Sequence, residues 1–197
     1  MKFLTLFFSI VLVASCSISQ NYSSSNKKAV KLFEEAMKAP SLSIDPVRRT
    51  PNFRAGIELA EKAIAKDPRF WEAHLLAAEL YENYYEYPAA IKHYEAALAI
   101  NPNHAPSGST YFYLGNSQFA VGDYQGALKN LEIYNKNRSA DPRMLQAANQ
   151  LMDNCEFALD AIKNPAKYNP INVGPGINTA DPEYFPTITV DGKTILF

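Results

Sequence analysis

The residues best suited to chemistry are three histidines and a short glycine motif. His74 and His93 lie in predicted helices, without the His-Glu-x-x-His pattern or the cysteine pairs that zinc sites use. Gly174 and Gly176 lie in a proline-rich segment instead of joining a strand to a helix, as a phosphate-binding loop does. The sequence also lacks a Gly-x-Ser-x-Gly motif for a serine nucleophile. We therefore predict no catalytic residue, no metal and no cofactor, and a protein that is not an enzyme.

The composition is that of a folded protein without a strong charge. Hydrophobic residues make up 47% of the chain and charged residues 20%, and the formal net charge is −1. Such a balance produces no field that would attract nucleic acid. We expect protein partners, with no nucleic acid and no small-molecule substrate among them.

The first residues predict export and a lipid. Lys2 precedes an apolar run of about 11 residues, which is typical of a signal peptide over residues 1–15 and too short to span a bilayer. The run ends in Val13-Ala14-Ser15-Cys16, which resembles a bacterial lipobox. The resemblance implies that Cys16 is lipidated. The alternative is an ordinary signal peptide that is cleaved elsewhere, with a cysteine there by chance.

Ser17 follows the cysteine where an aspartate would favour the inner membrane. Resemblance to lipoproteins of bacteria with two membranes therefore implies anchoring in the outer membrane, and we expect the protein to face the periplasm. Residues 16–25 are serine-rich and polar, so we expect a flexible tether. The other cysteine, Cys155, lies on an apolar helical stripe, where we predict a buried thiol and no disulfide.

A repeat organises the middle of the chain. Residues 71–103 predict two short helices with a turn near Glu86-Tyr87. Gly56-Ile57 lies 34 residues before Ala90-Ile91, and Ala127-Leu128 lies 37 residues after it in the same pattern. A helix-turn-helix unit with a period near 34 is typical of tetratricopeptide repeats.

The third copy carries this resemblance best. Tyr111 stands at the usual tryptophan position, and Leu114-Gly115, a Gly122-Asp123-Tyr124 turn and Ala127 follow it. The chain thus resembles a tetratricopeptide repeat protein over about 115 residues. The resemblance implies an all-α solenoid of about three repeats over residues 26–162.

Two departures from a plain repeat array are expected. We predict the helices of the first repeat over residues 26–39 and 52–66, so the segment between them is an insertion that contains Arg48 and Arg49. The insertion either serves recognition or is a surface loop that is tolerated because it costs little free energy. The sequence favours neither. Residues 142–162 predict a capping helix with Asp141 as its N-cap and Pro142 as its first residue.

In the tetratricopeptide family the first helix of each repeat lines a concave groove. This resemblance places ten residues in a partner-binding groove: Glu72, Leu75, Glu79, Glu82 and Asn83 in the second repeat, and Ser109, Phe112, Asn116, Phe119 and Ala120 in the third. Phe112 and Phe119 are seven residues apart with Asn116 between them, which suggests a peptide-binding patch. The alternative is that another part of the chain already covers these rings.

The composition changes after the helices, over residues 163–197. Prolines end the helical pattern, and the string PEYFPTITVDGKTILF predicts a β-hairpin around Asp191-Gly192. It resembles the opening motif of TolB-type, WD-like β-propellers, of which only one copy is present. We therefore expect a propeller that continues beyond Phe197.

The lipobox, the repeats and the propeller motif together resemble outer-membrane lipoproteins of Bacteroidetes type, which often continue to an OmpA-like domain. The resemblance implies a cell-envelope scaffold for protein–protein interaction in a secretion, gliding or peptidoglycan-associated complex. The alternative is the accessory N-terminal region of an exported, propeller-containing hydrolase.

Overall fold

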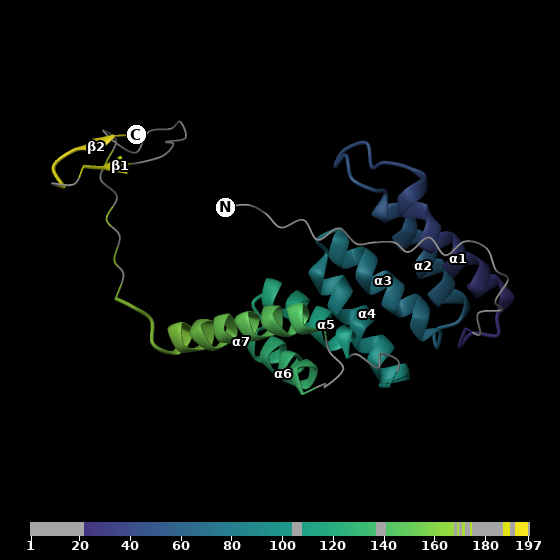
Figure 1. Ribbon diagram of the computed structural model, residues 1–197. Coiled ribbons are helices and arrows are strands. Elements are labelled where there is room, and N and C mark those ends of the chain that lie inside the picture. The colour runs from purple at the N-terminus through teal and green to yellow at the C-terminus, as the bar shows by residue number, and fades with distance from the viewer. Residues whose placement is uncertain are drawn as a thin grey trace. The chain divides into compact units, whose positions relative to one another are not determined.

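The computed structural model describes residues 22–103, 108–136 and 141–167, and residues 169, 171, 174, 187–189 and 192–196 of the tail. The chain divides into two units, residues 1–159 and 160–197. Seven helices make up the described part of the first unit, α7 extending four residues into the second (Figure 1). They are α1 (Lys27–Leu42), α2 (Phe53–Lys66), α3 (Trp71–Asn83), α4 (Tyr87–Ile100), α5 (Ser109–Ala120), α6 (Tyr124–Asn135) and α7 (Pro142–Lys163).

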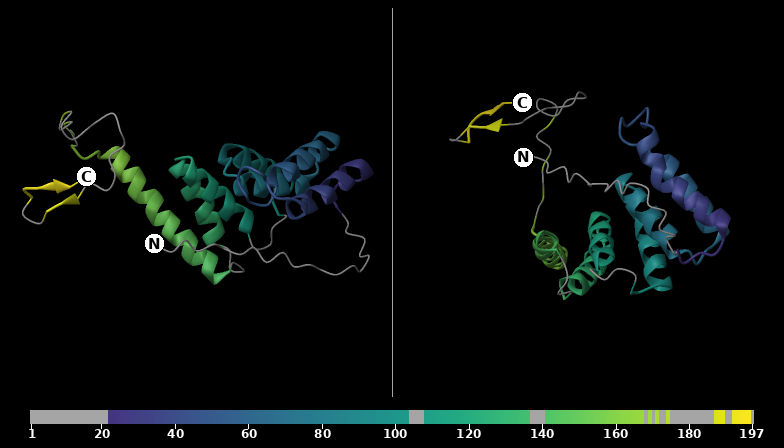
Figure 2. Two further views of the ribbon diagram at one scale, coloured as in Figure 1. Left: turned by 90° about the horizontal axis from the view of Figure 1, so that it is seen from above. Right: turned by 45° about the vertical axis from the view of Figure 1, so that its right-hand side comes forward.

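The helices pair as three consecutive hairpins, α1–α2, α3–α4 and α5–α6. From α1 to α6, each helix packs against the next one in the chain. The two further views show these hairpins stacked in sequence order, with α7 beside α5 and α6 (Figure 2). The expected all-α array of three repeats and a capping helix is therefore confirmed.

Short polar side chains fix where several helices begin. Asn26 and Asn52 accept hydrogen bonds from backbone N–H groups in the first turns of α1 and α2. Asp123 does the same for α6. The Asp141 carboxylate accepts from the backbone N–H of Arg143, at 2.8 Å, as the sequence predicts for α7.

The core between the hairpins is built mainly from alanine. Ten alanines of α1 to α6 have no exposed surface: Ala29, Ala36, Ala60, Ala63, Ala73, Ala77, Ala78, Ala90, Ala97 and Ala127. Small side chains let helix axes approach closely, and larger residues such as Tyr94, Leu131 and Tyr134 fill the remaining space. Gly115 marks one close approach, because a Cβ there would lie 2.8 Å from Cγ of Leu131.

The first helix is longer than predicted. It continues through Pro40 to Leu42, although we expected it to end at residue 39. A proline in the last turn removes only one backbone hydrogen bond, and the buried residues Ala36 and Ala39 keep this turn packed.

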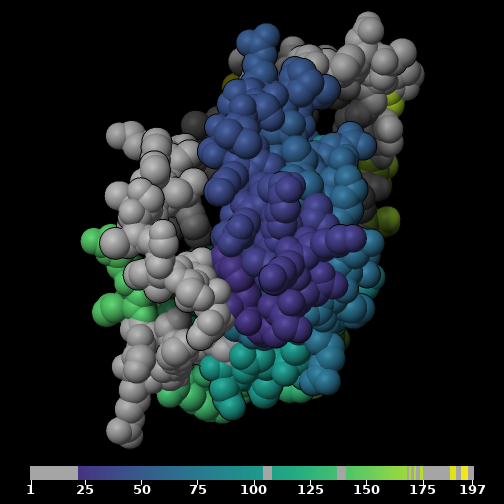
Figure 3. All heavy atoms as spheres, turned by 90° about the vertical axis from the view of Figure 1, so that its right-hand side faces the viewer, coloured from purple at the N-terminus to yellow at the C-terminus, as the bar shows by residue number. Residues whose placement is uncertain are grey.

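The insertion between α1 and α2, residues 43–52, is folded. Ile44 and Pro51 form an isolated antiparallel bridge, and the Asp45 carboxylate accepts from the backbone N–H groups of Val47 and Arg48, both at 2.8 Å. The Arg48 and Val47 donors hold the pKa of the Asp45 carboxyl below its usual value. In the space-filling view, the blue residues that follow α1 project above that purple helix (Figure 3).

The residues just before α1 lie against the repeats. The Tyr22 ring packs on Phe33 and Phe70, with centroid distances of 5.2 and 5.9 Å. The backbone N–H and the hydroxyl of Ser23 both donate to the Glu72 carboxylate. The Ser24 hydroxyl donates to Asp67. We expected a flexible tether over residues 16–25. Its last four residues are instead attached to α1, α2 and α3 through the Tyr22 ring and the two serines. Residues 16–21 lie outside the described residues.

The described part of the tail contains one small hairpin. Strands β1 (Thr187–Ile188) and β2 (Ile195–Leu196) pair antiparallel, with Thr187 opposite Leu196. Gly192 has a φ of 69°, a conformation that suits glycine in a tight turn. Asp191, on which the predicted turn is centred, is outside the described residues.

Candidate interaction groove

Helices α3 and α5 bring two of the predicted groove residues, Glu82 and Asn116, into contact. The Glu82 carboxylate is the link between the two helices: it accepts from the Asn116 side-chain amide at 2.9 Å and from the Tyr94 hydroxyl at 2.7 Å. Tyr94 comes from α4 and is fully buried, so Glu82 is held from two sides. Burial raises the pKa of the Glu82 carboxyl, and the two hydrogen bonds oppose that rise.

Glu79 lies one turn earlier on α3 and has no such support. Within the part of the chain that the structure describes, no hydrogen bond or ion pair reaches its carboxylate. The side chain keeps some exposed surface, yet the protein around it removes enough water to raise its pKa to about 7, with a further contribution from Glu82. Glu79 is therefore a partly exposed carboxyl whose charged form burial disfavours.

Tyr113 of α5 faces the same two carboxylates, and the sequence analysis did not include it. Its ring is half-buried and stacks on Tyr94 with a centroid distance of 6.5 Å. Burial raises the pKa of the Tyr113 hydroxyl, and the nearby charges of Glu79 and Glu82 add to this. Helix α5 contains two tyrosines, Tyr111 and Tyr113, and their spacing alone does not say which one faces α3.

Phe112 and Phe119 contact the chain itself. Both rings are partly buried and pack against the cluster that Ala127, Leu131, Tyr134, Ala148 and Cys155 form between α6 and α7. Phe112 lies 5.5 Å from the ring centroid of Tyr134, and Phe119 lies 5.5 Å from that of Tyr124. The structure gives both rings a packing role, and their part in partner binding stays a prediction.

The other predicted groove residues lie around this centre. The Glu72 carboxylate accepts a hydrogen bond from the backbone N–H of Ser23. Leu75 packs near Ala78 and Tyr94. Asn83 is exposed, and its side-chain amide donates to the backbone carbonyl of Glu79 at 2.7 Å. Ser109 and Ala120 are the first and last residues of α5, and only Ala120 is exposed.

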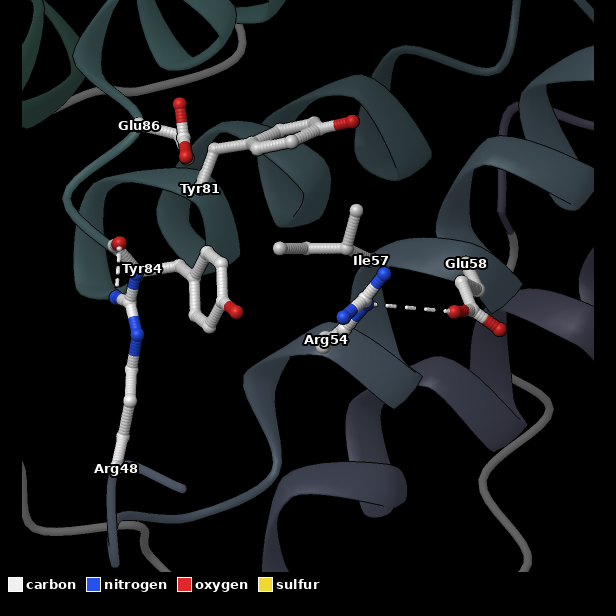
Figure 4. Close-up of a pocket in the computed structure, with 7 residues that line it drawn as sticks. All are labelled: Arg48, Arg54, Ile57, Glu58, Tyr81, Tyr84 and Glu86. Atoms are coloured by element: carbon white, nitrogen blue, oxygen red, sulfur yellow. Dashed lines mark hydrogen bonds and ion pairs between the residues drawn. The ribbon is translucent and has the colours of Figure 1, made fainter. Parts of the chain in front are cut away.

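A second surface feature lies between the insertion and the α3–α4 turn. It is a pocket of about 470 Å³ lined by Arg48, Arg54, Ile57, Glu58, Tyr81, Tyr84 and Glu86 (Figure 4). The Arg48 guanidinium donates to the backbone carbonyl of Tyr84 at 2.7 Å and lies 3.7 Å from the centroid of its ring. Arg48 therefore attaches the insertion to the second repeat, and Arg54 pairs with Glu58 at 3.9 Å.

Two buried histidines join a hydrogen-bonded chain that ends at the partly exposed Glu61. His74 Nδ1 lies 3.1 Å from His93 Nδ1, and His93 Nε2 lies 3.0 Å from the Glu61 carboxylate, which also accepts from the Tyr81 hydroxyl. Burial lowers the pKa of His93. This chain ties α2, α3 and α4 together. His104 lies outside the described residues.

The described residues include no group of three or more histidine, cysteine or acidic side chains that could hold a metal ion. Across the same residues, no helix combines the length and the apolar character needed to cross a membrane. Cys155 is buried and has a free thiol, whose pKa burial raises. Cys16 lies outside the described residues.

Comparison with known proteins shows the fold. No family model and no curated protein matches the chain. Among solved structures it is similar to the Sgt2 TPR domain from Aspergillus fumigatus, with a TM-score of 0.53, 17% identity, and coverage of 78% of this chain and 94% of that one. The fold is that of a tetratricopeptide repeat domain.

Two other solved repeat domains agree with this assignment. The first TPR of Spaghetti (RPAP3), bound to the HSP90 peptide SRMEEVD, has a TM-score of 0.53 and 19% identity, and covers 68% of this chain and 94% of that one. The protein MamA has a TM-score of 0.50 and 19% identity, and covers 71% of this chain and 81% of that one. At these identities, the similarity concerns the tetratricopeptide repeat fold alone.

Proposed function

We propose that this protein is a non-enzymatic scaffold that binds another protein through the groove between α3 and α5. The observation that carries the proposal is the unpaired Glu79 on α3, three residues before Glu82, whose carboxylate Asn116 of α5 holds by a hydrogen bond. A solved neighbour of the same fold holds a peptide, which supports a peptide-binding role. That peptide is acidic, however, and the glutamates of α3 would repel it, so we do not carry over its identity.

Site-specific photo-crosslinking in cells tests the groove. A photoreactive amino acid at Asn83 or Ala120, both exposed on the groove helices, should form a crosslinked species of higher mass on illumination. The same amino acid at Lys92, exposed on α4, is the matched control and should form none. Equal crosslinking from Lys92, or none from the two groove positions, would contradict the assignment.

The proposed location is the outer membrane, with Cys16 lipidated and the repeats in the periplasm. The lipobox-like sequence before Cys16 supports this, and the propeller-like hairpin in the tail supports a role in a larger envelope complex for secretion, gliding or peptidoglycan attachment. Two acyl chains anchor a protein durably where one does not.

Replacement of the cysteine tests the anchor. The Cys16→Ala variant should leave the membrane fraction after a high-salt wash, because the described helices include none able to cross a bilayer. Retention of the variant in washed membranes would exclude lipid anchoring at this residue.

A further inference from the structure

We propose that Glu79, Glu82 and Tyr113 form a site for one basic side chain, lysine or arginine, on an extended segment of the partner protein. The proposal rests on the proposed function and adds the chemistry of the partner. It depends on the local charge, on the unpaired carboxylate and on the aromatic ring beside it.

The two helices that line the groove carry charge of one sign. Helix α3 contains Glu72, Glu79 and Glu82 and no lysine or arginine, and α5 contains no charged residue. The whole chain has a formal net charge of only −1, so this is a local arrangement. Helix α1, by contrast, carries lysines and glutamates together. A groove of one sign selects partners of the opposite charge and repels those of the same charge.

The arrangement of the two carboxylates leaves one position for a cation. Tyr94 and Asn116 fix Glu82, whereas Glu79 has no partner among the described residues. Burial raises the pKa of the Glu79 carboxyl, and the nearby charge of Glu82 adds to that rise. A lysine ammonium or an arginine guanidinium would relieve the repulsion between the two carboxylates and form charge-assisted hydrogen bonds with both groups.

Tyr113 supplies the third element of the site. Its stacking on the buried Tyr94 fixes the ring beside the carboxylates. Aromatic rings attract cations through the negative charge on their faces. A carboxylate pair with a tyrosine therefore suits a basic side chain, and suits neither an acidic nor a purely apolar one.

The experiment selects peptides from a random 12-residue phage-displayed library on the intact protein at pH 8. We expect the selected peptides to share one lysine or arginine at a fixed position, and its replacement by glutamine should weaken binding about tenfold, as the loss of a buried ion pair does. Glu79→Gln should weaken binding by a similar factor. Glu95→Gln, a change of equal charge at an exposed position on α4, should leave it unchanged.

The pH dependence provides an independent readout. Affinity for a selected peptide should fall as the pH is lowered from 8 to 6, because Glu79 gains a proton in that range, and the fall should vanish in Glu79→Gln. The other titratable groups that face Glu79 are Glu82, Tyr94 of α4 and Tyr113 of α5; both tyrosines have raised pKa values and stay neutral at these pH values.

The remaining outcomes separate this inference from the function on which it rests. Selected peptides that are acidic or apolar, and that bind Glu79→Gln as well as the original protein, would overturn the basic-residue site and leave a peptide-binding groove. Failure to select any peptide would contradict both.

Discussion

Glu79 and Glu82 are three residues apart on one helix, yet the protein treats them differently. The Glu82 carboxylate accepts hydrogen bonds from two neighbouring helices. The Glu79 carboxyl is also desolvated, but it has no hydrogen-bond donor among the described residues. An unpaired group in such a place costs free energy of folding, and groups with strongly shifted pKa values cluster at functional sites.

This cost predicts how stability changes with pH. The pKa of Glu79 is about 7 in the folded protein, above its ordinary value of 4.5, so the folded state binds the proton more tightly. Stability should therefore decrease as the pH rises from about 4.5 to 7. Glu79→Gln should be more stable than the original protein at pH 8, by about 1–3 kcal/mol, and by much less at pH 4.5.

Urea denaturation of both proteins at the two pH values measures this difference. Glu95→Gln, which changes an exposed carboxylate, is the control and should show no pH-dependent gain. An equal effect of Glu79→Gln at both pH values would show that its carboxyl titrates normally.

Phe112 provides a second prediction for a single residue. Its ring packs between α5 and the α6–α7 cluster, so Phe112→Ala should cost about 2 kcal/mol of folding free energy. Phe157 of α7 is 77% exposed, and Phe157→Ala should change stability by less than about 0.5 kcal/mol. Thermal unfolding followed by circular dichroism compares the two. Equal effects would mean that Phe112 is not held in this cluster.

The insertion shows how one side chain attaches one element to another. Arg48 lies on the Tyr84 ring and donates to its backbone carbonyl. The neighbouring Arg49, at a φ of 54°, makes no such contact with the described residues. Arg48→Ala should therefore speed hydrogen–deuterium exchange of residues 43–52 and change overall stability by about 1 kcal/mol or less.

Arg49→Ala is the matched control, because it removes the same charge next to the same turn. It should leave exchange of the insertion unchanged. Faster exchange in both variants would point to the charge, and not to the contact with Tyr84, as what holds the insertion.

At the scale of helices, the sequence predicted those features that a local residue pattern determines: the positions of the hairpins and the start of α7. The repeat spacing located the hairpins, and Asp141-Pro142 located the start of α7. The end of α1 was predicted three residues too early. Proline disfavours helix in the residue before it, but the packing of α1 on α2 keeps the helix intact through Pro40. The Arg48–Tyr84 contact joins residues 36 apart, and a sequence pattern holds no signal for such a pair.

The groove was predictable only as a list of positions. Family resemblance placed Glu79, Glu82 and Asn116 on its helices, but the hydrogen bonds that separate a fixed carboxylate from an unpaired one depend on Tyr94 of a third helix. Tyr113 was missed for a similar reason: only the stacked helices show which tyrosine faces the acids.

For the whole molecule, the division of the chain into two units predicts that the repeats fold independently of the tail. Deleting residues 165–197 removes the hairpin and no residue of the seven helices in the described part of the chain. The melting temperature of the repeats should change by less than about 2 °C, measured by circular dichroism on both proteins. A loss of several degrees would mean that the tail belongs to the helical unit.

The attachment of Tyr22, Ser23 and Ser24 to the repeats also determines a length. Only six residue steps separate Tyr22 from Cys16, and a chain of that length spans at most about 20 Å. An acyl anchor at Cys16 would therefore hold Tyr22 close to the membrane surface. The surface of α1 and α3 where Phe33, Phe70 and Glu72 contact this segment would stay within that distance of the lipid headgroups. This distance is smaller than the length of α1. A partner would therefore have to reach the groove close to the membrane surface.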